Sequence, residues 1–186
     1  MSKKVVLFLA EGFEEVEAVT PIDYLRRAGF EVAVCAVGDS QSVKGARGIT
    51  LKADTTLEAL GSRGADFWDA AVVPGGMPGA ANIAASKEAG ALLVEMAAAG
   101  KTVAAICAAP ALVLFPLGLL NGKNFTCYPG MEKNLSGANW LGQPVVVDGG
   151  IITSRGAGTA GLFSVSIIEQ LAGAEAAEKI AAAVLL

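Results

Sequence analysis

The sequence contains no histidine among its 186 residues. This absence excludes every catalytic pair in which a histidine of the same chain activates a serine or cysteine. It also argues against a zinc site, because no closely spaced pair of cysteines compensates for the missing imidazoles. We therefore expect no metal site, and any proton transfer at neutral pH must use another side chain.

The chain also lacks clusters of basic residues. It has 14 Lys and Arg against 18 Asp and Glu, which gives a net charge of -4. A nucleic-acid partner or an anionic membrane surface is therefore not expected. Hydrophobic residues make up 53% of the sequence and charged residues only 17%, so a large core and one domain over residues 1–186 are predicted.

No long hydrophobic run of the kind that spans a membrane is present. Residues 102–120 carry no charge, but Pro110, Pro116 and Gly118 interrupt them, which favours a buried strand followed by a buried helix. The apolar run Val5–Ala10 is too short for the core of a signal peptide. We therefore predict a cytoplasmic protein.

Cysteine is scarce, with three residues at wide spacing, Cys35, Cys107 and Cys127. An odd number at such spacing argues against a disulfide framework. Cys35 lies within an apolar run and is predicted to be core. Cys127 precedes Tyr128 at the end of another run and is predicted at the rim of a cleft.

Short apolar runs alternate with segments of helical periodicity along the chain. The predicted strands are Lys4–Ala10, Glu31–Val37, Ala70–Pro74, Thr102–Ile106 and Phe125–Tyr128, with hairpins over residues 43–53 and 145–153. The predicted helices are Glu15–Ala28, Thr56–Leu60, Lys87–Ala99, Ala109–Leu117, Leu162–Leu171 and Ala174–Leu185. This order indicates an α/β fold with a mostly parallel sheet covered by helices on both faces.

Cys107 is the strongest candidate for chemistry. It lies where a predicted strand turns into a helix, and the small residues Ala105 and Ala109 stand two positions to either side, as a nucleophile on a sharp turn requires. The first amides of the helix, including that of Ala108, are expected to face the sulfur and to lower the pKa of the thiol. The alternative is a buried, inert cysteine.

Two further segments follow predicted strands. Gly75 and Gly76 open a glycine-rich loop whose amides could bind an oxyanion, although an ordinary turn is the alternative. In the acidic segment after the first strand, Glu14 and Glu15 are interpreted as charges that complement a helix dipole. Val16 and Val19 mark the apolar face of the predicted helix. Glu17 lies one position off that face, so it could turn inward and share a proton with a thiolate.

Two arginines, Arg47 and Arg155, follow strand-like segments and could bind an anion or a partner subunit. The alternative is that both are solvated.

Four motifs make the sequence similar to the ThiJ/PfpI superfamily, in particular to the branch of the Parkinson-disease-associated protein deglycase. They are Glu14-Glu15-Val16-Glu17, Val73-Pro74-Gly75-Gly76, residues 104–110 (AAICAAP) and residues 153–159 (TSRGAGT). The resemblance implies a flavodoxin-like fold, a homodimer and no cofactor. It also implies roles for residues at matching positions: a reactive Cys107, a protonated Glu17 bonded to it, backbone amides at Gly75 and Gly76, and anion contacts from Arg47 and Arg155.

The resemblance implies a glutathione-independent glyoxalase that converts methylglyoxal to lactate, or a protein deglycase, in defence against carbonyl or oxidative stress. In this hypothesis the Cys107 thiolate attacks the aldehyde, and Glu17 moves a proton between two carbons. The alternative is a redox-sensing, chaperone-like dimer in which Cys107 is oxidised to sulfinic acid with little turnover.

The sequence departs from many relatives at two positions. Tyr128 stands where many have histidine, and Ala157 replaces a proline. Tyrosine can hydrogen-bond a substrate, but a pKa near 10 makes it a poor base. This departure disfavours the protease and glutaminase branches, which depend on a Cys–His pair.

Overall fold

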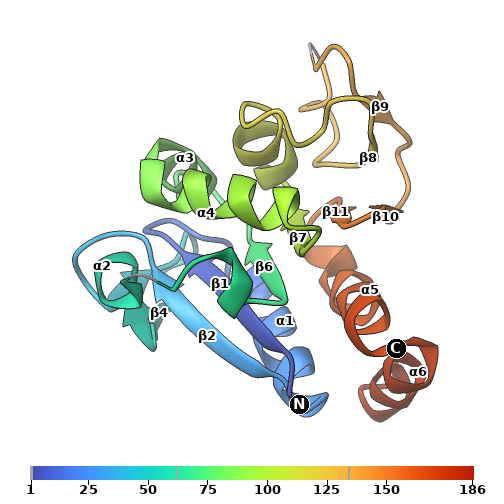
Figure 1. The fold of residues 1–186 in the computed structure, drawn as a ribbon, viewed down its shortest axis with the longest axis horizontal. Helices are drawn as coiled ribbons and strands as arrows, with labels where there is room; N and C mark the ends of the chain where they lie inside the picture. The colour runs from blue at the N-terminus through green and yellow to red at the C-terminus, as the bar shows by residue number, and fades with distance from the viewer. Residues whose placement is uncertain (1, 62, 134) are drawn as a thin grey trace.

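A computed structural model of the chain describes residues 2–61, 63–133 and 135–186. Its centre is a seven-stranded sheet with the strand order β10-β11-β7-β6-β1-β2-β5 (Figure 1). The strands are β1 (Lys4–Leu9), β2 (Glu31–Ala36), β5 (Thr55–Thr56), β6 (Ala70–Val73), β7 (Thr102–Ile106), β10 (Val145–Asp148) and β11 (Ile151–Ser154). All neighbouring pairs are parallel except β10 and β11, which confirms the mostly parallel sheet.

Helices cover both faces of the sheet, as predicted. One face carries α1 (Glu15–Arg27), α5 (Ala160–Ala172) and α6 (Ala174–Ala183). The other carries α2 (Leu57–Leu60), α3 (Gly79–Ala85), α4 (Lys87–Ala98) and the short segments η1 (Ala65–Phe67) and η2 (Pro110–Leu114). The fold is therefore a single flavodoxin-like domain.

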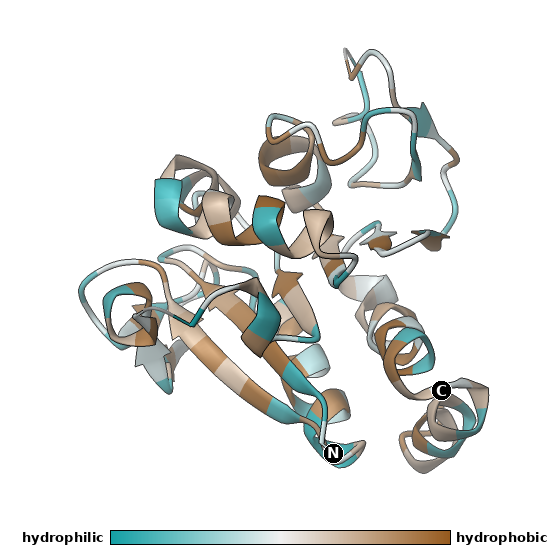
Figure 2. Ribbon diagram, viewed as in Figure 1, coloured by the Kyte–Doolittle hydropathy of each residue, from teal (hydrophilic) through white to brown (hydrophobic). Residues whose placement is uncertain are grey.

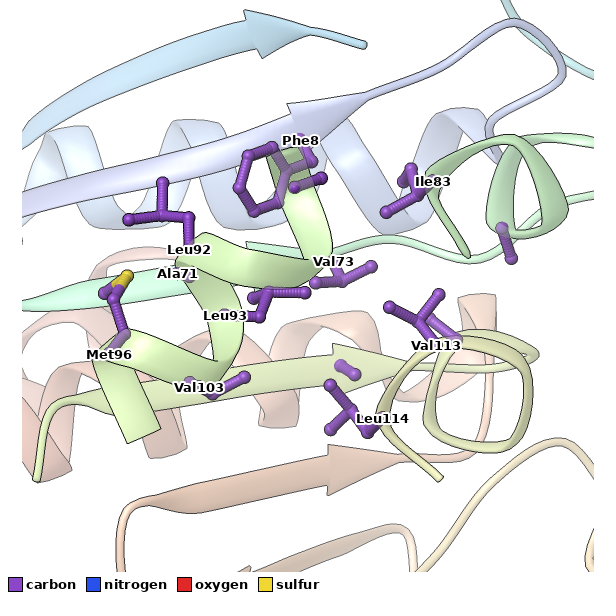
Figure 3. Close-up of a cluster of buried hydrophobic side chains, with 14 of the residues drawn as sticks. Phe8, Ala71, Val73, Ile83, Leu92, Leu93, Met96, Val103, Val113 and Leu114 are labelled. Carbon is purple, nitrogen blue, oxygen red and sulfur yellow. The ribbon is translucent and has the colours of Figure 1, made fainter. Parts of the chain in front are cut away.

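Side chains of the central strands alternate between two cores. In β1, Val5 and Leu7 face the core under α1 and α5, whereas Val6 and Phe8 face the core under α4. Figure 3 shows the second core, in which Leu93 of α4 lies among strand side chains. Because both faces are buried, the central strands are mainly hydrophobic (Figure 2), and this continuous apolar pattern made them predictable.

Two smaller sheets lie outside the central one. The antiparallel pair β3 (Ser42–Lys44) and β4 (Thr50–Lys52) confirms the first predicted hairpin. The parallel pair β8 (Asn124–Phe125) and β9 (Asn139–Trp140) replaces the longer strand predicted to end at Tyr128. That strand stops early because the Tyr128 amide donates to the carbonyl of Cys107, at 2.8 Å, rather than to a strand partner.

Helix α1 confirms the predicted helix and runs through Pro21. Two helical segments differ from the prediction. The helix α3 was not predicted, because Pro78 and Gly79 at its start favour a turn. The predicted helix Ala109–Leu117 is reduced to η2, a π-type segment in which the Phe115 amide donates to the Pro110 carbonyl at 3.0 Å.

The uncharged residues 102–120 divide into the buried strand β7, η2 and the turns that follow. In the part of the chain that the structure describes, no helix has both the length and the apolar character needed to cross a membrane.

Candidate active site

Cys107 lies on a sharp turn directly after β7. Its φ angle is 65°, in the left-handed region, which costs a residue with a side chain about 1–2 kcal/mol. Two backbone hydrogen bonds hold this conformation: the Cys107 amide donates to the Ser154 carbonyl at 2.9 Å, and its carbonyl accepts from the Tyr128 amide. The predicted strand-to-helix turn is therefore present and held from both sides.

Helix α1 directs Glu17 into the protein, where the residue is 1% exposed. Its Oε2 atom accepts a hydrogen bond from the Gly75 amide at 3.0 Å. Val16 and Val19, taken from the sequence as the apolar face, are instead exposed. The buried side of the first turn of α1 thus carries a carboxyl group. Its burial is tolerated because the Gly75 amide, which follows β6, donates a hydrogen bond to it.

Gly75 separates the carboxyl from the thiol. A Cβ atom at this position would lie 2.6 Å from Glu17 Oε2 and 2.7 Å from Cys107 Cβ. Both distances are shorter than real side chains tolerate, so only glycine allows the two groups to approach. Gly75 thus has two roles. Its amide donates a hydrogen bond to the carboxyl of Glu17, and its lack of a side chain lets that carboxyl lie beside the thiol of Cys107.

We predict that Gly75→Ala destabilises the protein by about 2–3 kcal/mol, because the added methyl group must displace Glu17 or Cys107. Urea denaturation measures this loss, and the rate of alkylation of Cys107 should change with it. Gly64→Ala is the matched control, since a Cβ there meets nothing within 4 Å. Equal stability of the two variants would contradict the close approach at Gly75.

Burial is the main influence on the carboxyl. It raises the pKa of Glu17 from 4.5 to about 7, and the charge of Glu14 acts in the same direction. The interaction with Cys107 and the amides of Gly75 and Ala157 oppose this rise. Glu17 therefore changes its protonation state near neutral pH, as a group that transfers protons requires.

The thiol does not have the lowered pKa expected from the sequence. Burial, followed by the charge of Glu17 and the hydrogen bond with it, raises the pKa of Cys107 to about 12. The amides of Ala108 and Gly76 act to lower this pKa, but their effect is smaller than that of burial and Glu17. The expectation was wrong because η2 is only five residues long, so no extended helix dipole faces the sulfur, and the nearest charge is negative.

The two groups therefore titrate as a pair. The first proton leaves near neutral pH, and the remaining one is held between the sulfur of Cys107 and the carboxyl of Glu17. In this singly charged pair the carboxylate can accept the thiol proton when the sulfur attacks an electrophile.

A cavity of about 670 Å³ opens above the pair. Its lining brings together six of the predicted site residues: Glu17, Arg47, Gly76, Cys107, Ala108 and Tyr128. Gly75 is not part of this lining and lies between the carboxyl and the thiol. Arg155 does not line the cavity, and its amide donates to the carbonyl of Pro144 at 3.3 Å.

Glu15 is a residue whose role was missed in the sequence. It is 5% exposed, and its Oε1 atom accepts from the amides of Arg47 at 2.7 Å and Ile49 at 3.3 Å. It also lies directly against Gly45. Glu15 thus fixes the turn between β3 and β4, which places Arg47 at the cavity. The sequence suggested only a charge that complements a helix dipole.

The other two cysteines are fully buried and free. Burial raises the pKa of both Cys35 and Cys127 to about 12. Cys35 is core as predicted, but Cys127 belongs to the core beneath α4 and does not lie at the rim. Within the described ranges, no group of three or more Cys, Asp and Glu side chains is arranged to hold a metal ion.

A half-buried cysteine on a strained turn, a buried glutamate beside it and two amides facing the sulfur define an α/β protein with a Cys–Glu site. The sequence model of the DJ-1/PfpI family matches residues 3–170. The chain belongs to this family.

Similar proteins extend over nearly the whole chain. Protein dj-1beta of Drosophila melanogaster is 39% identical and covers 100% of this chain and 98% of its own length. A solved structure of oxidized DJ-1 from Toxoplasma gondii has a TM-score of 0.94 at 40% identity and covers 99% of this chain and 98% of its own. A protein of Pyrococcus horikoshii named as a deglycase is 32% identical and covers 82% and 89%.

Proposed function

We propose that this protein is a cofactor-independent enzyme that acts on 2-oxoaldehydes of the methylglyoxal type, as a glyoxalase or a protein deglycase, in defence against carbonyl or oxidative stress. The observation that carries the proposal is the Cys107–Glu17 pair in the lining of the cavity. The archaeal relative named as a deglycase supports the same class of chemistry.

In the first step, the sulfur of Cys107 forms a bond to the aldehyde carbon. The thiol proton moves to the carboxylate of Glu17, whose raised pKa makes it a stronger base than an exposed glutamate. The amides of Gly76 and Ala108, which face the sulfur, stabilise the negative charge that develops on the aldehyde oxygen. Glu17 then passes this proton to that oxygen, which gives a hemithioacetal and leaves Glu17 as a carboxylate.

In the second step, Glu17 removes the proton from the former aldehyde carbon and returns a proton to the neighbouring ketone carbon through an enediol. One carbon is oxidised to the thioester level and the other is reduced to an alcohol, so no external oxidant or reductant is needed. Water then cleaves the thioester, which releases the 2-hydroxy acid and regenerates the thiol.

The test is methylglyoxal consumption by the purified protein without glutathione. We expect one lactate formed for each methylglyoxal lost. The deglycase form is tested with a methylglyoxal adduct of N-acetylcysteine. Lactate formation from this adduct that is faster than its spontaneous release of free aldehyde would identify a deglycase. Aldehyde loss without lactate would overturn the proposal, because simple trapping by thiols and amines consumes the aldehyde but forms no hydroxy acid.

The second candidate is a redox sensor in which Cys107 is oxidised to sulfinic acid. It is supported by the half-buried sulfur at the cavity and by the similar structure from Toxoplasma gondii, which is of an oxidized DJ-1. Two molecules of peroxide would add two oxygen atoms and release two waters. Intact mass after mild peroxide, measured beside turnover, separates the candidates: rapid gain of two oxygens with no lactate formed favours the sensor.

A homodimer in the cytoplasm remains part of the proposal. The exposed Val16 and Val19 on α1 support it, since neighbouring apolar side chains on a surface favour a protein contact. Light scattering should give twice the chain mass, and Val19→Glu should lower that value. A monomer at micromolar concentration would remove the dimer from the proposal. The cytoplasmic location is tested separately by cell fractionation.

A further inference from the structure

The cavity above Cys107 is large for the smallest 2-oxoaldehydes. Its volume of about 670 Å³ lies within the range of about 300–1,000 Å³ that is typical of sites for drug-sized ligands. Methylglyoxal bound at the sulfur would leave most of this space to water. The cavity therefore has room for a larger group next to the reacting carbons.

The rim of the cavity is apolar and comes from two loops. Met77 follows β6, and Tyr128, Pro129 and Met131 follow β8. Met77 is 58% exposed and Tyr128 is 54% exposed. Methionine adapts its shape to apolar ligands and makes favourable contacts with aromatic rings, and a tyrosine ring can stack on another ring.

The backbone of Tyr128 is fixed relative to the reacting sulfur. Its amide donates to the carbonyl of Cys107 at 2.8 Å, and its ring lies against the backbone of Gly156, where an added Cβ would be 3.7 Å from Cδ2. A tyrosine side chain is a poor base at neutral pH. Its contribution at this position is therefore a ring surface in the same cavity lining as Cys107.

The charged groups of the cavity do not favour a highly charged substrate. In the lining that the structure describes, these are Glu14, Glu17 and Arg47. Glu17 belongs to the reacting pair, and the other two carry opposite charges. The side chains left to recognise the remainder of the substrate are the apolar ones.

Building on the proposed function, we propose that the preferred substrates are 2-oxoaldehydes carrying an aromatic group, of which phenylglyoxal is the simplest. The ring of the substrate occupies the space between Met77 and Tyr128 while its aldehyde carbon bonds to the sulfur of Cys107. The chemistry is unchanged: the aldehyde carbon is oxidised, the ketone is reduced, water is added, and mandelic acid is the product.

The test compares kcat/KM for phenylglyoxal and methylglyoxal in wild type and variants, because the change in their ratio cancels the intrinsic reactivity of each aldehyde. Met77→Ala and Tyr128→Ala should each lower the ratio about 10-fold. This is the lower end of the range of about 10–200-fold that the loss of one apolar contact causes. Tyr128→Phe should keep it within about 2-fold, since the ring remains. Val147→Ala, an exposed apolar residue of β10 outside the cavity lining, should leave it unchanged.

The outcomes separate this inference from the proposed function. A ratio that stays the same in both alanine variants, with methylglyoxal still converted to lactate, would overturn the aromatic preference alone. Absence of hydroxy acid from either aldehyde would overturn the proposed function. A fall in the ratio in Tyr128→Phe equal to that in Tyr128→Ala would assign recognition to the hydroxyl and overturn the role of the ring.

Discussion

The substitution Cys107→Ser is expected to reduce kcat/KM for methylglyoxal by about 10³-fold or more. A serine hydroxyl occupies nearly the same space, but its proton is far harder to remove than that of a thiol. Glu17, with a pKa raised to about 7, is too weak a base to deprotonate an alcohol. The oxygen would therefore remain protonated beside the aldehyde and form no covalent intermediate.

The measurement is lactate formation by the purified variant, with thermal unfolding recorded beside it to confirm that the fold is intact. Cys35→Ala is the matched control, because it removes a buried thiol outside the cavity lining and should keep most of the activity. If wild type and Cys107→Ser consume methylglyoxal and form lactate equally, the thiol is not the nucleophile and the enzymatic proposal fails.

The substitution Glu17→Gln is expected to stabilise the protein at alkaline pH relative to wild type. In wild type the folded state holds the Glu17 proton up to about pH 7, whereas an ordinary glutamate releases it near 4.5. Proton uptake on folding favours the native state at low pH, and this contribution is lost as the pH rises through about 7. Glutamine has no such proton, so the difference in unfolding free energy should grow by about 3 kcal/mol between about pH 4 and pH 8.5.

Urea denaturation of both proteins across this pH range checks the prediction. Glu175→Gln, on an exposed position of α6, should show no such divergence from wild type. The same Glu17→Gln variant should lose about 10²–10⁴-fold in turnover, because the proton carrier is gone. Parallel pH profiles for wild type and Glu17→Gln would contradict the raised pKa of the carboxyl.

The sequence predicted those features that depend on neighbouring residues. The strand Thr102–Ile106 is continuously apolar, and small residues around Cys107 fit a sharp turn, so both the sheet and the turn were predictable. Glu17 was predicted from its position only as an acid that could turn inward, and its bond to Cys107 was implied by the family resemblance. Its inward direction depends on the amide of Gly75, 58 residues along the chain, and periodicity placed Val16 inside instead.

Other features depend on contacts that no local pattern contains. The burial of Glu15 depends on the turn that holds Arg47, 32 residues later. Arg155 matched a family motif but lies outside the cavity lining. The direction of the thiol pKa also required the structure, because burial and a neighbouring charge outweigh the two amides that the sequence suggested.

The backbone bonds around Cys107 also bear on how the protein is made. The groups that hold the turn belong to Tyr128 and Ser154, which the ribosome adds after the cysteine itself. A growing chain that ends before residue 128 contains the thiol but neither of these partners. The Cys107–Glu17 pair should therefore form only after the last third of the chain has joined the sheet, so that a growing chain presents Cys107 as an ordinary thiol.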